Sequence, residues 1–242
     1  MRRVTLLLLP GLDGTEVLLR PLVAALPRWI DARVVTYPPP GEHVYDELLL
    51  LARRALAGVR ECYVLGWSFA GPLAVMLAGA EPDKVRGIVL AASFVRPPRP
   101  FLARASFALA RPLVWLWRAA RRLPLLCRER TDPLRRAKWE TWRRVSAGAV
   151  AARLRAIAQV DVSGLLAGCR QPVVYLASSA DGIVPRHNAD EVLRLRPSAK
   201  MVVIEGPHLS LFTNPQAAAR AIADFIGHQT VTAQSEYRAA SS

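Results

Sequence analysis

The segment GWSFAG at positions 66–71 carries the clearest chemical pattern in the sequence. It directly follows the apolar run Cys62–Leu65 and opens a stretch with helical patterning. A serine on a tight turn from strand to helix holds its hydroxyl above the end of the sheet, where it can act as a nucleophile. Such a turn needs small residues two positions before and after Ser68, and Gly66 and Ala70 meet that need, although the pattern G-x-S-x-G departs at Ala70. The alternative is an ordinary Gly-Ser turn, which the strand–turn–helix context disfavours.

A serine hydroxyl needs a base to remove its proton, and the base needs an acid to orient it. Downstream of Ser68, Asp181 follows the apolar run Val173–Ala177 and His208 follows the run Met201–Ile204. The carboxyl ends of parallel strands meet at one edge of a sheet, so the three side chains can converge there. An Asp-Gly pair alone usually marks only a turn. The joint placement at strand ends predicts a triad with a nucleophile, a base and an orienting acid.

The loop PGLDG at positions 10–14 follows the first apolar run and offers the fourth component of such a site. Glycines there allow backbone N–H groups to face a ligand. The amides of Leu12 and Phe69 are therefore the predicted donors to a negatively charged substrate oxygen, an oxyanion hole. A phosphate-binding loop is the rival interpretation, but the segment lacks both G-x-G-x-x-G and G-x-x-x-x-G-K-[ST].

Alternating strand and helix patterns must position these residues. Short apolar runs without period-2 alternation are typical of strands covered on both faces. The expected strands are Val4–Leu9, Arg33–Tyr37, Cys62–Leu65, Gly87–Ala91, Val173–Ala177 and Met201–Ile204. The expected helices cover about 16–26, 44–58, 69–80, 187–195 and 215–227. This order predicts an α/β fold with a mostly parallel sheet of about six strands and helices on both faces.

A basic block interrupts this alternation. Between Arg96 and Arg155 the chain has 16 Lys and Arg residues and three acidic ones, which accounts for +13 of its formal net charge of +14. The block reads as two or three helices, about 100–123 and 131–158, inserted after the fourth strand. We therefore predict a core of residues 1–95 and 160–230, a helical lid of residues 96–159 over the carboxyl edge of the sheet, and a disordered tail at 231–242.

The lid is expected to govern substrate choice. Trp67 beside the serine and Trp115 and Trp117 in the lid are candidate substrate-binding residues, although the lid aromatic residues could equally pack the lid onto the sheet. Three interpretations of the arginines stay open: a solvated surface, an anionic partner such as an acidic carrier protein or a carboxylate-bearing substrate, and an anionic membrane surface. No nucleic-acid recognition motif accompanies the charge, so a specific nucleic-acid partner is not expected.

Cysteine content and the N-terminus bear on location and cofactors. Cys62, Cys127 and Cys169 are an odd number without a CxxC pair, which disfavours disulfides and a zinc site and favours the cytoplasm. The apolar run at the N-terminus is short and is read as a strand, not as a targeting segment. The predicted chemistry requires no metal or organic cofactor.

The combined motifs resemble those of the α/β-hydrolase superfamily, and the likeness covers nearly all of residues 4–227. Within it, the chain resembles the pimeloyl-carrier-protein methyl-ester esterase type, from which its lid diverges. The resemblance implies that Ser68 is the nucleophile, His208 the base and Asp181 the orienting acid in an esterase that forms an acyl-enzyme. Thioesterase and lactonase activity are near variants, and the substrate is a small or carrier-linked ester. The alternative is a non-hydrolytic member of the fold, either a binding scaffold or a cofactor-free enzyme of another reaction type.

Overall fold

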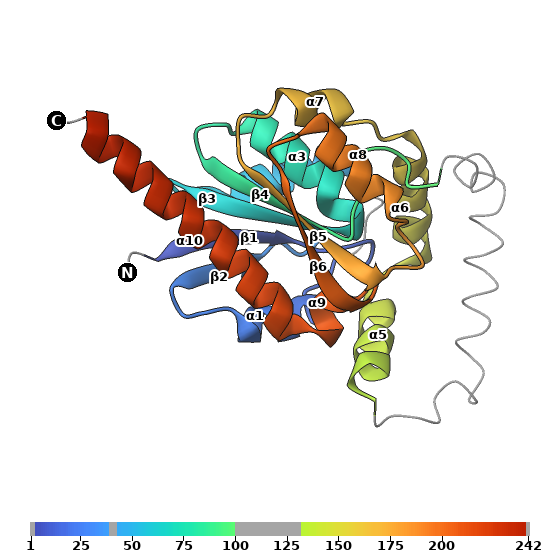
Figure 1. The fold of residues 1–242 in the computed structure, drawn as a ribbon. Coiled ribbons are helices and arrows are strands. Elements are labelled where there is room, and N and C mark those ends of the chain that lie inside the picture. The colour runs from blue at the N-terminus through green and yellow to red at the C-terminus, as the bar shows by residue number, and fades with distance from the viewer. Residues whose placement is uncertain (1–2, 39–42, 100–131, 241–242) are drawn as a thin grey trace.

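A six-stranded sheet forms the centre of the molecule (Figure 1). The computed structural model describes the backbone of residues 3–38, 43–99 and 132–240, with side chains up to residue 229. The strand order is β2-β1-β3-β4-β5-β6, and all five pairings are parallel. The strands are β1 (Val4–Leu9), β2 (Ile30–Val34), β3 (Cys62–Trp67), β4 (Val85–Ala91), β5 (Val173–Ala180) and β6 (Lys200–Pro207). The predicted α/β fold class is confirmed.

Burial on both faces explains why the inner strands have no alternation. The four leucines that end β1 are fully buried, with Leu7 and Leu9 in one apolar cluster and Leu6 and Leu8 in the other. Successive side chains of a strand point to opposite faces, so a strand with helices on both sides needs apolar residues at every position.

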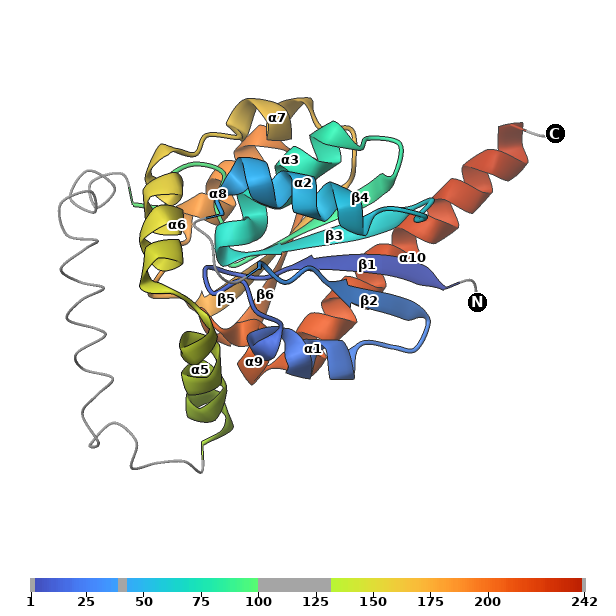
Figure 2. The same cartoon turned by 180° about the vertical axis from the view of Figure 1, so that it is seen from behind.

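Two groups of helices supply those covers (Figures 1 and 2). One face packs against α1 (Arg20–Ala25), α9 (Ser210–Thr213) and α10 (Pro215–Ala240), preceded by the short 3₁₀ helix η1 (Val17–Leu19). The other face packs against α2 (Tyr45–Ala55), α3 (Gly71–Ala80), α7 (Ser163–Gly168) and α8 (His187–Leu195). A second 3₁₀ helix, η2 (Ser68–Ala70), joins β3 to α3.

The second strand and the last helix are two of the elements that differ from the expectation from sequence. The second strand was expected at Arg33–Tyr37 but spans Ile30–Val34, because its pairing with β1 starts at Val4 opposite Ile30. It is an edge strand, so its mixed sequence contains less of the apolar signal that marks the inner strands. The last helix was expected to end near Gly227 before a disordered tail but extends to Ala240, because no glycine or proline after Gly227 stops it.

Two lid helices lie at the carboxyl edge of the sheet, across the molecule from both termini (Figure 2). The helix expected at about 131–158 is divided into α5 (Pro133–Arg144) and α6 (Ala147–Gln159) by the extended residues Val145 and Ser146. The Ser146 side chain accepts a hydrogen bond from the amide of Ala149 and so caps α6. The helix expected at 100–123 lies outside the described residues.

The two ends of the lid segment meet at the core. The amide of Val162 donates a hydrogen bond of 2.9 Å to the carbonyl of Val95. Across the described ranges, no helix is both long and apolar enough to span a membrane. The same ranges contain no group of three or more His, Cys, Asp and Glu side chains that could hold a metal ion.

Candidate active site

Ser68 lies at the turn between β3 and α3 in a strained backbone conformation. Its φ is +52°, a left-handed value that non-glycine residues rarely adopt and that clusters at functional sites. Close packing of the turn explains the residue types around it, because a Cβ on Gly66 would overlap the carbonyl of Ala70. Ala70 itself is fully buried and fits, so alanine at the position two after the serine does not disrupt the turn.

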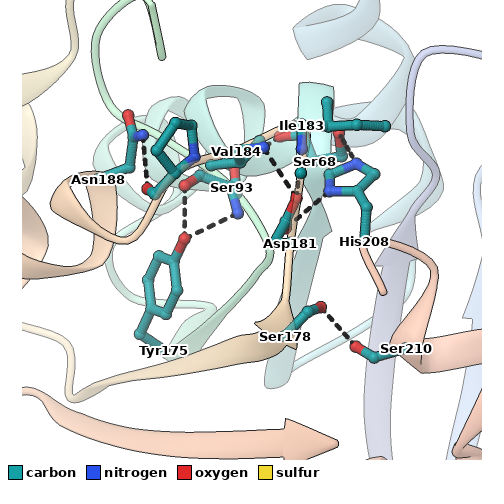
Figure 3. Close-up of polar contacts among 12 residues, drawn as sticks. Ser68, Ser93, Tyr175, Ser178, Asp181, Ile183, Val184, Asn188, His208 and Ser210 are labelled. Atoms are coloured by element: carbon teal, nitrogen blue, oxygen red, sulfur yellow. Dashed lines mark hydrogen bonds and ion pairs between the residues drawn. The ribbon is translucent and has the colours of Figure 1, made fainter. Parts of the chain in front are cut away.

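The glycine of the motif lies at position 71, one place later than in G-x-S-x-G, and packing explains why position 71 is a glycine. A Cβ on Gly71 would overlap the hydroxyl of Ser93, which follows β4. Ser93 Oγ donates a hydrogen bond of 2.5 Å to the backbone carbonyl of Ser68. The Tyr175 hydroxyl in turn accepts from the Ser93 amide at 3.0 Å and donates to the Ser93 carbonyl at 2.6 Å. The two strands next in the sheet on one side of β3, β4 and β5, therefore brace the turn that exposes Ser68 (Figure 3).

The structure brings Ser68, His208 and Asp181 into one hydrogen-bonded series (Figure 3). His208 Nε2 lies 2.9 Å from Ser68 Oγ, and His208 Nδ1 lies 2.8 Å from Asp181 Oδ2. An ionised carboxylate only accepts hydrogen bonds, so Asp181 favours the tautomer with the proton on Nδ1. His208 Nε2 is then the acceptor for the serine hydroxyl, which is the arrangement that a general base requires.

The Asp181 carboxylate is held in its ionised form. Burial opposes ionisation, but hydrogen bonds from His208 and from the amides of Val184 and Ile183 outweigh it and lower the pKa of Asp181. The two amides donate to Oδ1 at 2.8 and 2.9 Å, while Oδ2 bonds the imidazole. Both oxygens thus have partners that fix the orientation of the carboxylate.

Hydrogen bonds of two serines at the end of β5 connect the loops that carry the acid and the base. Ser178 Oγ lies 2.7 Å from Ser210 Oγ, which joins the end of β5 to α9. Ser179 Oγ accepts a hydrogen bond of 3.0 Å from the amide of Gly206, whose φ of +131° permits the turn before His208. These contacts hold the Asp181 and His208 loops at a fixed spacing.

The predicted oxyanion loop packs directly against the serine. A Cβ on Gly11 would lie 3.8 Å from Ser68 Cβ, so the loop and the turn are in close approach. Within the described chain, no hydrogen bond of the Leu12 amide is found. A hydrogen bond to the backbone holds the loop in place, because the Tyr37 hydroxyl donates to the Pro10 carbonyl at 2.8 Å. Within the described chain, no protein acceptor therefore competes with a ligand for the Leu12 N–H.

Phe69 contributes its backbone to this region and its side chain to the core. The ring is fully buried, stacked on Tyr45 at 4.7 Å between ring centroids and edge-on to Tyr37 at 6.3 Å. The Tyr45 hydroxyl donates to the Phe69 carbonyl at 3.0 Å. These contacts fix the backbone of the residue after Ser68, whose amide is the second predicted oxyanion donor.

A pocket of about 380 Å³ opens beside Ser68 and His208. Trp67, a predicted substrate-binding residue, is among its lining residues. Trp115 and Trp117, the other two, lie outside the described residues. Most of the remaining wall is apolar and comprises Leu12, Leu18, Leu134, Trp142, Ile183 and Leu209. A cavity of this size and character suits a small organic substrate.

Several basic side chains of the described part of the lid contact the chain itself. Arg96 forms ion pairs with Asp161 and Glu191, and Arg144 pairs with Glu16. Arg153 is 2% exposed and donates to the Leu12 carbonyl at 2.8 Å. The sequence pattern, which left a solvated surface, an anionic partner and a membrane surface open for the arginines, does not indicate these structural contacts.

The fold agrees with the comparison to known families. Residues 5–221 match the Alpha/beta hydrolase family model, and the chain belongs to that family. The family assignment confirms the resemblance to the α/β-hydrolase superfamily, while the likeness to the pimeloyl-carrier-protein methyl-ester esterase type stays a prediction. No curated protein matches the sequence significantly.

Solved structures with the same fold come from proteins of several activities. An enol-lactonase from Burkholderia xenovorans has a TM-score of 0.77 and 18% identity, over 94% of this chain and 92% of that one. A thermophilic esterase from Thermogutta terrifontis has a TM-score of 0.73 and 20% identity, over 94% and 91%. A bromoperoxidase from Bacillus anthracis has a TM-score of 0.69 and 16% identity, over 94% and 92%. At these identities the likeness establishes the fold alone.

Proposed function

We propose that this chain is a serine hydrolase that cleaves carboxylic esters through an acyl-enzyme intermediate. The observation that carries the proposal is the continuous series from Ser68 Oγ to His208 and Asp181, at 2.9 and 2.8 Å. The strained turn at Ser68 and the apolar pocket beside it support the same interpretation. The esterase and lactonase among the similar structures are consistent with it, and the bromoperoxidase shows that the fold also hosts other reactions.

The first half of the reaction forms the acyl-enzyme. His208 Nε2 accepts the Ser68 hydroxyl proton while Oγ attacks the ester carbonyl carbon. The carbonyl oxygen becomes an oxyanion, which the amides of Leu12 and Phe69 stabilise. Collapse of the tetrahedral intermediate breaks the bond to the alkoxy oxygen, and His208 gives its proton to the departing alcohol.

Water completes the second half. His208 accepts a proton from a water molecule whose oxygen attacks the acyl carbon, and collapse returns the proton to Ser68 Oγ and releases the acid. The net change is ester plus water to acid plus alcohol. Asp181 stays ionised throughout and stabilises the imidazolium, a role that suits its lowered pKa.

The test is covalent labelling combined with turnover of 4-nitrophenyl esters from acetyl to palmitoyl. A fluorophosphonate probe should label the wild-type chain, and peptide mapping should locate the adduct on Ser68. Ser68→Ala should abolish labelling and lower kcat by roughly 10⁴–10⁶-fold. Ser198→Ala is the matched control, since Ser198 is exposed and precedes β6 at the opposite edge of the sheet.

Two results would contradict the proposal. One is an unlabelled wild-type chain without turnover of any ester, which would favour the non-hydrolytic alternative. The other is a Ser68→Ala chain that hydrolyses esters at the wild-type rate, which would place the nucleophile elsewhere.

A further inference from the structure

Helix α5 forms one wall of the pocket beside Ser68, and the proposed reaction uses none of its side chains. The α5 residues that line the pocket are Leu134, Lys138, Thr141 and Trp142. Their spacing places them on one face of the helix. Lys138 and Thr141, one turn apart, are the polar members of an otherwise apolar face.

Within the described chain, two buried polar groups of the pocket residues have no hydrogen-bond partner. Thr141 is 0% exposed, and no hydrogen-bond partner of its Oγ1 is found in the described chain. Trp67, on the β3 side of the same pocket, is 2% exposed, and its Nε1 likewise has none. Burying a donor without an acceptor costs free energy, which an acceptor on a bound molecule would restore.

Lys138 differs in its ion pairing from Arg144, which lies further along α5. Arg144 pairs with Glu140 at 2.6 Å and with Glu16 at 2.8 Å, and this network fastens α5 to the residues before η1. Lys138 is exposed, and within the described ranges it has no ion pair. The network therefore fixes the helix without involving the Lys138 ammonium group.

Among the described residues that line the pocket, no carboxylate forms an ion pair with that ammonium group. Among its described lining residues, Asp13 is the only carboxylate. Asp13 Oδ2 already accepts hydrogen bonds from the amide and the hydroxyl of Thr15, at 2.9 and 2.5 Å. Within the described residues, the donors at the α5 wall of the pocket thus have no carboxylate paired with them.

The chemistry of these donors identifies the complementary group. An ammonium group and an indole N–H can only donate, and a threonine hydroxyl can donate as well. We propose that the pocket takes esters that carry a second, free carboxylate, bound by Lys138 and Thr141 with the Trp67 N–H as a further donor. This inference rests on the proposed ester hydrolysis at Ser68. A neutral acyl chain would leave the same donors unpaired, and such sites discriminate against analogues that lack the matching group.

The kinetic test compares two esters of equal length. Mono-4-nitrophenyl adipate carries the free carboxylate, and methyl 4-nitrophenyl adipate has it capped. The wild-type chain should prefer the acid ester in kcat/KM. Lys138→Met and Thr141→Val should each reduce that preference by about tenfold, measured as the ratio of kcat/KM for the acid ester to kcat/KM for the neutral ester. Thr141→Ser, which keeps the hydroxyl, should retain it, and high salt should weaken it.

A binding test separates this inference from the catalytic one. Calorimetric titration of the Ser68→Ala chain compares adipate with hexanoate, without any turnover. We expect adipate to bind about tenfold more tightly and Lys138→Met in the same background to remove the difference. Lys200→Met is the charge-matched control, since Lys200 is exposed at the start of β6, away from the pocket.

The outcomes are distinguishable. A chain that hydrolyses both adipate esters equally, with no effect of Lys138→Met, would overturn the carboxylate subsite and leave the hydrolase proposal standing. A chain that hydrolyses no ester but binds adipate through Lys138 would support the subsite and overturn the hydrolase proposal. If Lys200→Met and Lys138→Met lost the preference for the carboxylate ligand equally, the effect would follow from the net charge of the protein, and this would contradict the subsite.

Discussion

Arg153 of helix α6 donates a hydrogen bond from Nη1 to the backbone carbonyl of Leu12, at 2.8 Å. Its guanidinium also lies 5.0 Å from the centre of the Tyr37 ring, and the Tyr37 hydroxyl bonds the Pro10 carbonyl of the same loop. The lid therefore contacts the predicted oxyanion loop through one buried arginine. Because the peptide unit between Gly11 and Leu12 carries the proposed oxyanion donor, Arg153 is suited to be a positioning residue for that donor.

Replacing Arg153 should affect the chemical step more than substrate binding. We expect Arg153→Met to lower kcat about tenfold or more with a smaller change in KM, because a displaced oxyanion donor weakens transition-state stabilisation. Arg153→Lys should lose less, and added guanidinium ion should partly restore Arg153→Met. Arg170→Met, at an exposed position, controls for the loss of charge. A fall in activity that only follows the folded fraction, without rescue, would reduce Arg153 to a structural role.

Gly71 offers a test of the braced turn at Ser68. Gly71→Ala should destabilise the fold by about 1–3 kcal/mol and lower activity, because the new methyl overlaps Ser93 Oγ, which bonds the Ser68 carbonyl. The double variant Gly71→Ala with Ser93→Ala should recover part of the stability. Thermal unfolding and ester turnover measure both effects.

A second glycine of α3 provides the control for that test. A Cβ on Gly79 would lie 3.9 Å from its nearest neighbour, Leu165. Gly79→Ala should therefore stabilise the chain by roughly 0.5–1 kcal/mol through helix propensity. If Gly71→Ala were as well tolerated as Gly79→Ala, the overlap with Ser93 would not affect the free energy of unfolding, which would contradict the prediction.

The three strands that carry the site and the residues beyond them could be predicted because their chemistry restricts residue type, although β3, β5 and β6 end at Trp67, Ala180 and Pro207, later than expected. A nucleophilic serine needs a tight turn, and its partners need the same edge of the sheet, so local patterns sufficed for Ser68, Asp181 and His208. The contact between Ser93 and Tyr175 could not be predicted, because it depends on the register of neighbouring strands. In the sequence, the glycine at position 71, in place of position 70, is the one sign that a side chain packs closely against this turn.

The roles of individual lid residues could not be predicted from the number of charges in the lid. Arg153 belongs to a block of many arginines, and composition alone does not separate a buried guanidinium from a solvated one. A signal was present, because Arg153 follows Ala149 and Val150 by four and three residues on the buried face of α6. Thr141 gave no comparable signal, since a threonine in a helix is ordinary until its surroundings are known.

Asp181 should stabilise the fold only at pH values above the acid range. Its pKa is lowered in the folded state, so its contribution is present above the pKa of the unfolded chain and is lost as pH falls through the folded value. The difference in Tm between the wild type and Asp181→Asn should therefore shrink on going from pH 6 to about pH 3. Calorimetry across that range provides the measurement, and a difference independent of pH would contradict the ionised Asp181–His208 pair.

Asp13 should show the opposite dependence. Burial raises its pKa despite the hydrogen bonds from Thr15 and the nearby charge of Arg153. A raised pKa means that the group favours folding below the unfolded pKa and opposes it increasingly as pH rises through the folded value. Asp13→Asn keeps an acceptor for Thr15 without the charge, so its Tm should gain on the wild type as pH rises from about 3 to 7. Esterase activity should persist, because Asp13 contacts none of the three triad residues through a hydrogen bond in the described chain. A Tm for Asp13→Asn that falls relative to the wild type over the same pH range would show that the Asp13 carboxylate is stabilised by Arg153 more than burial opposes it.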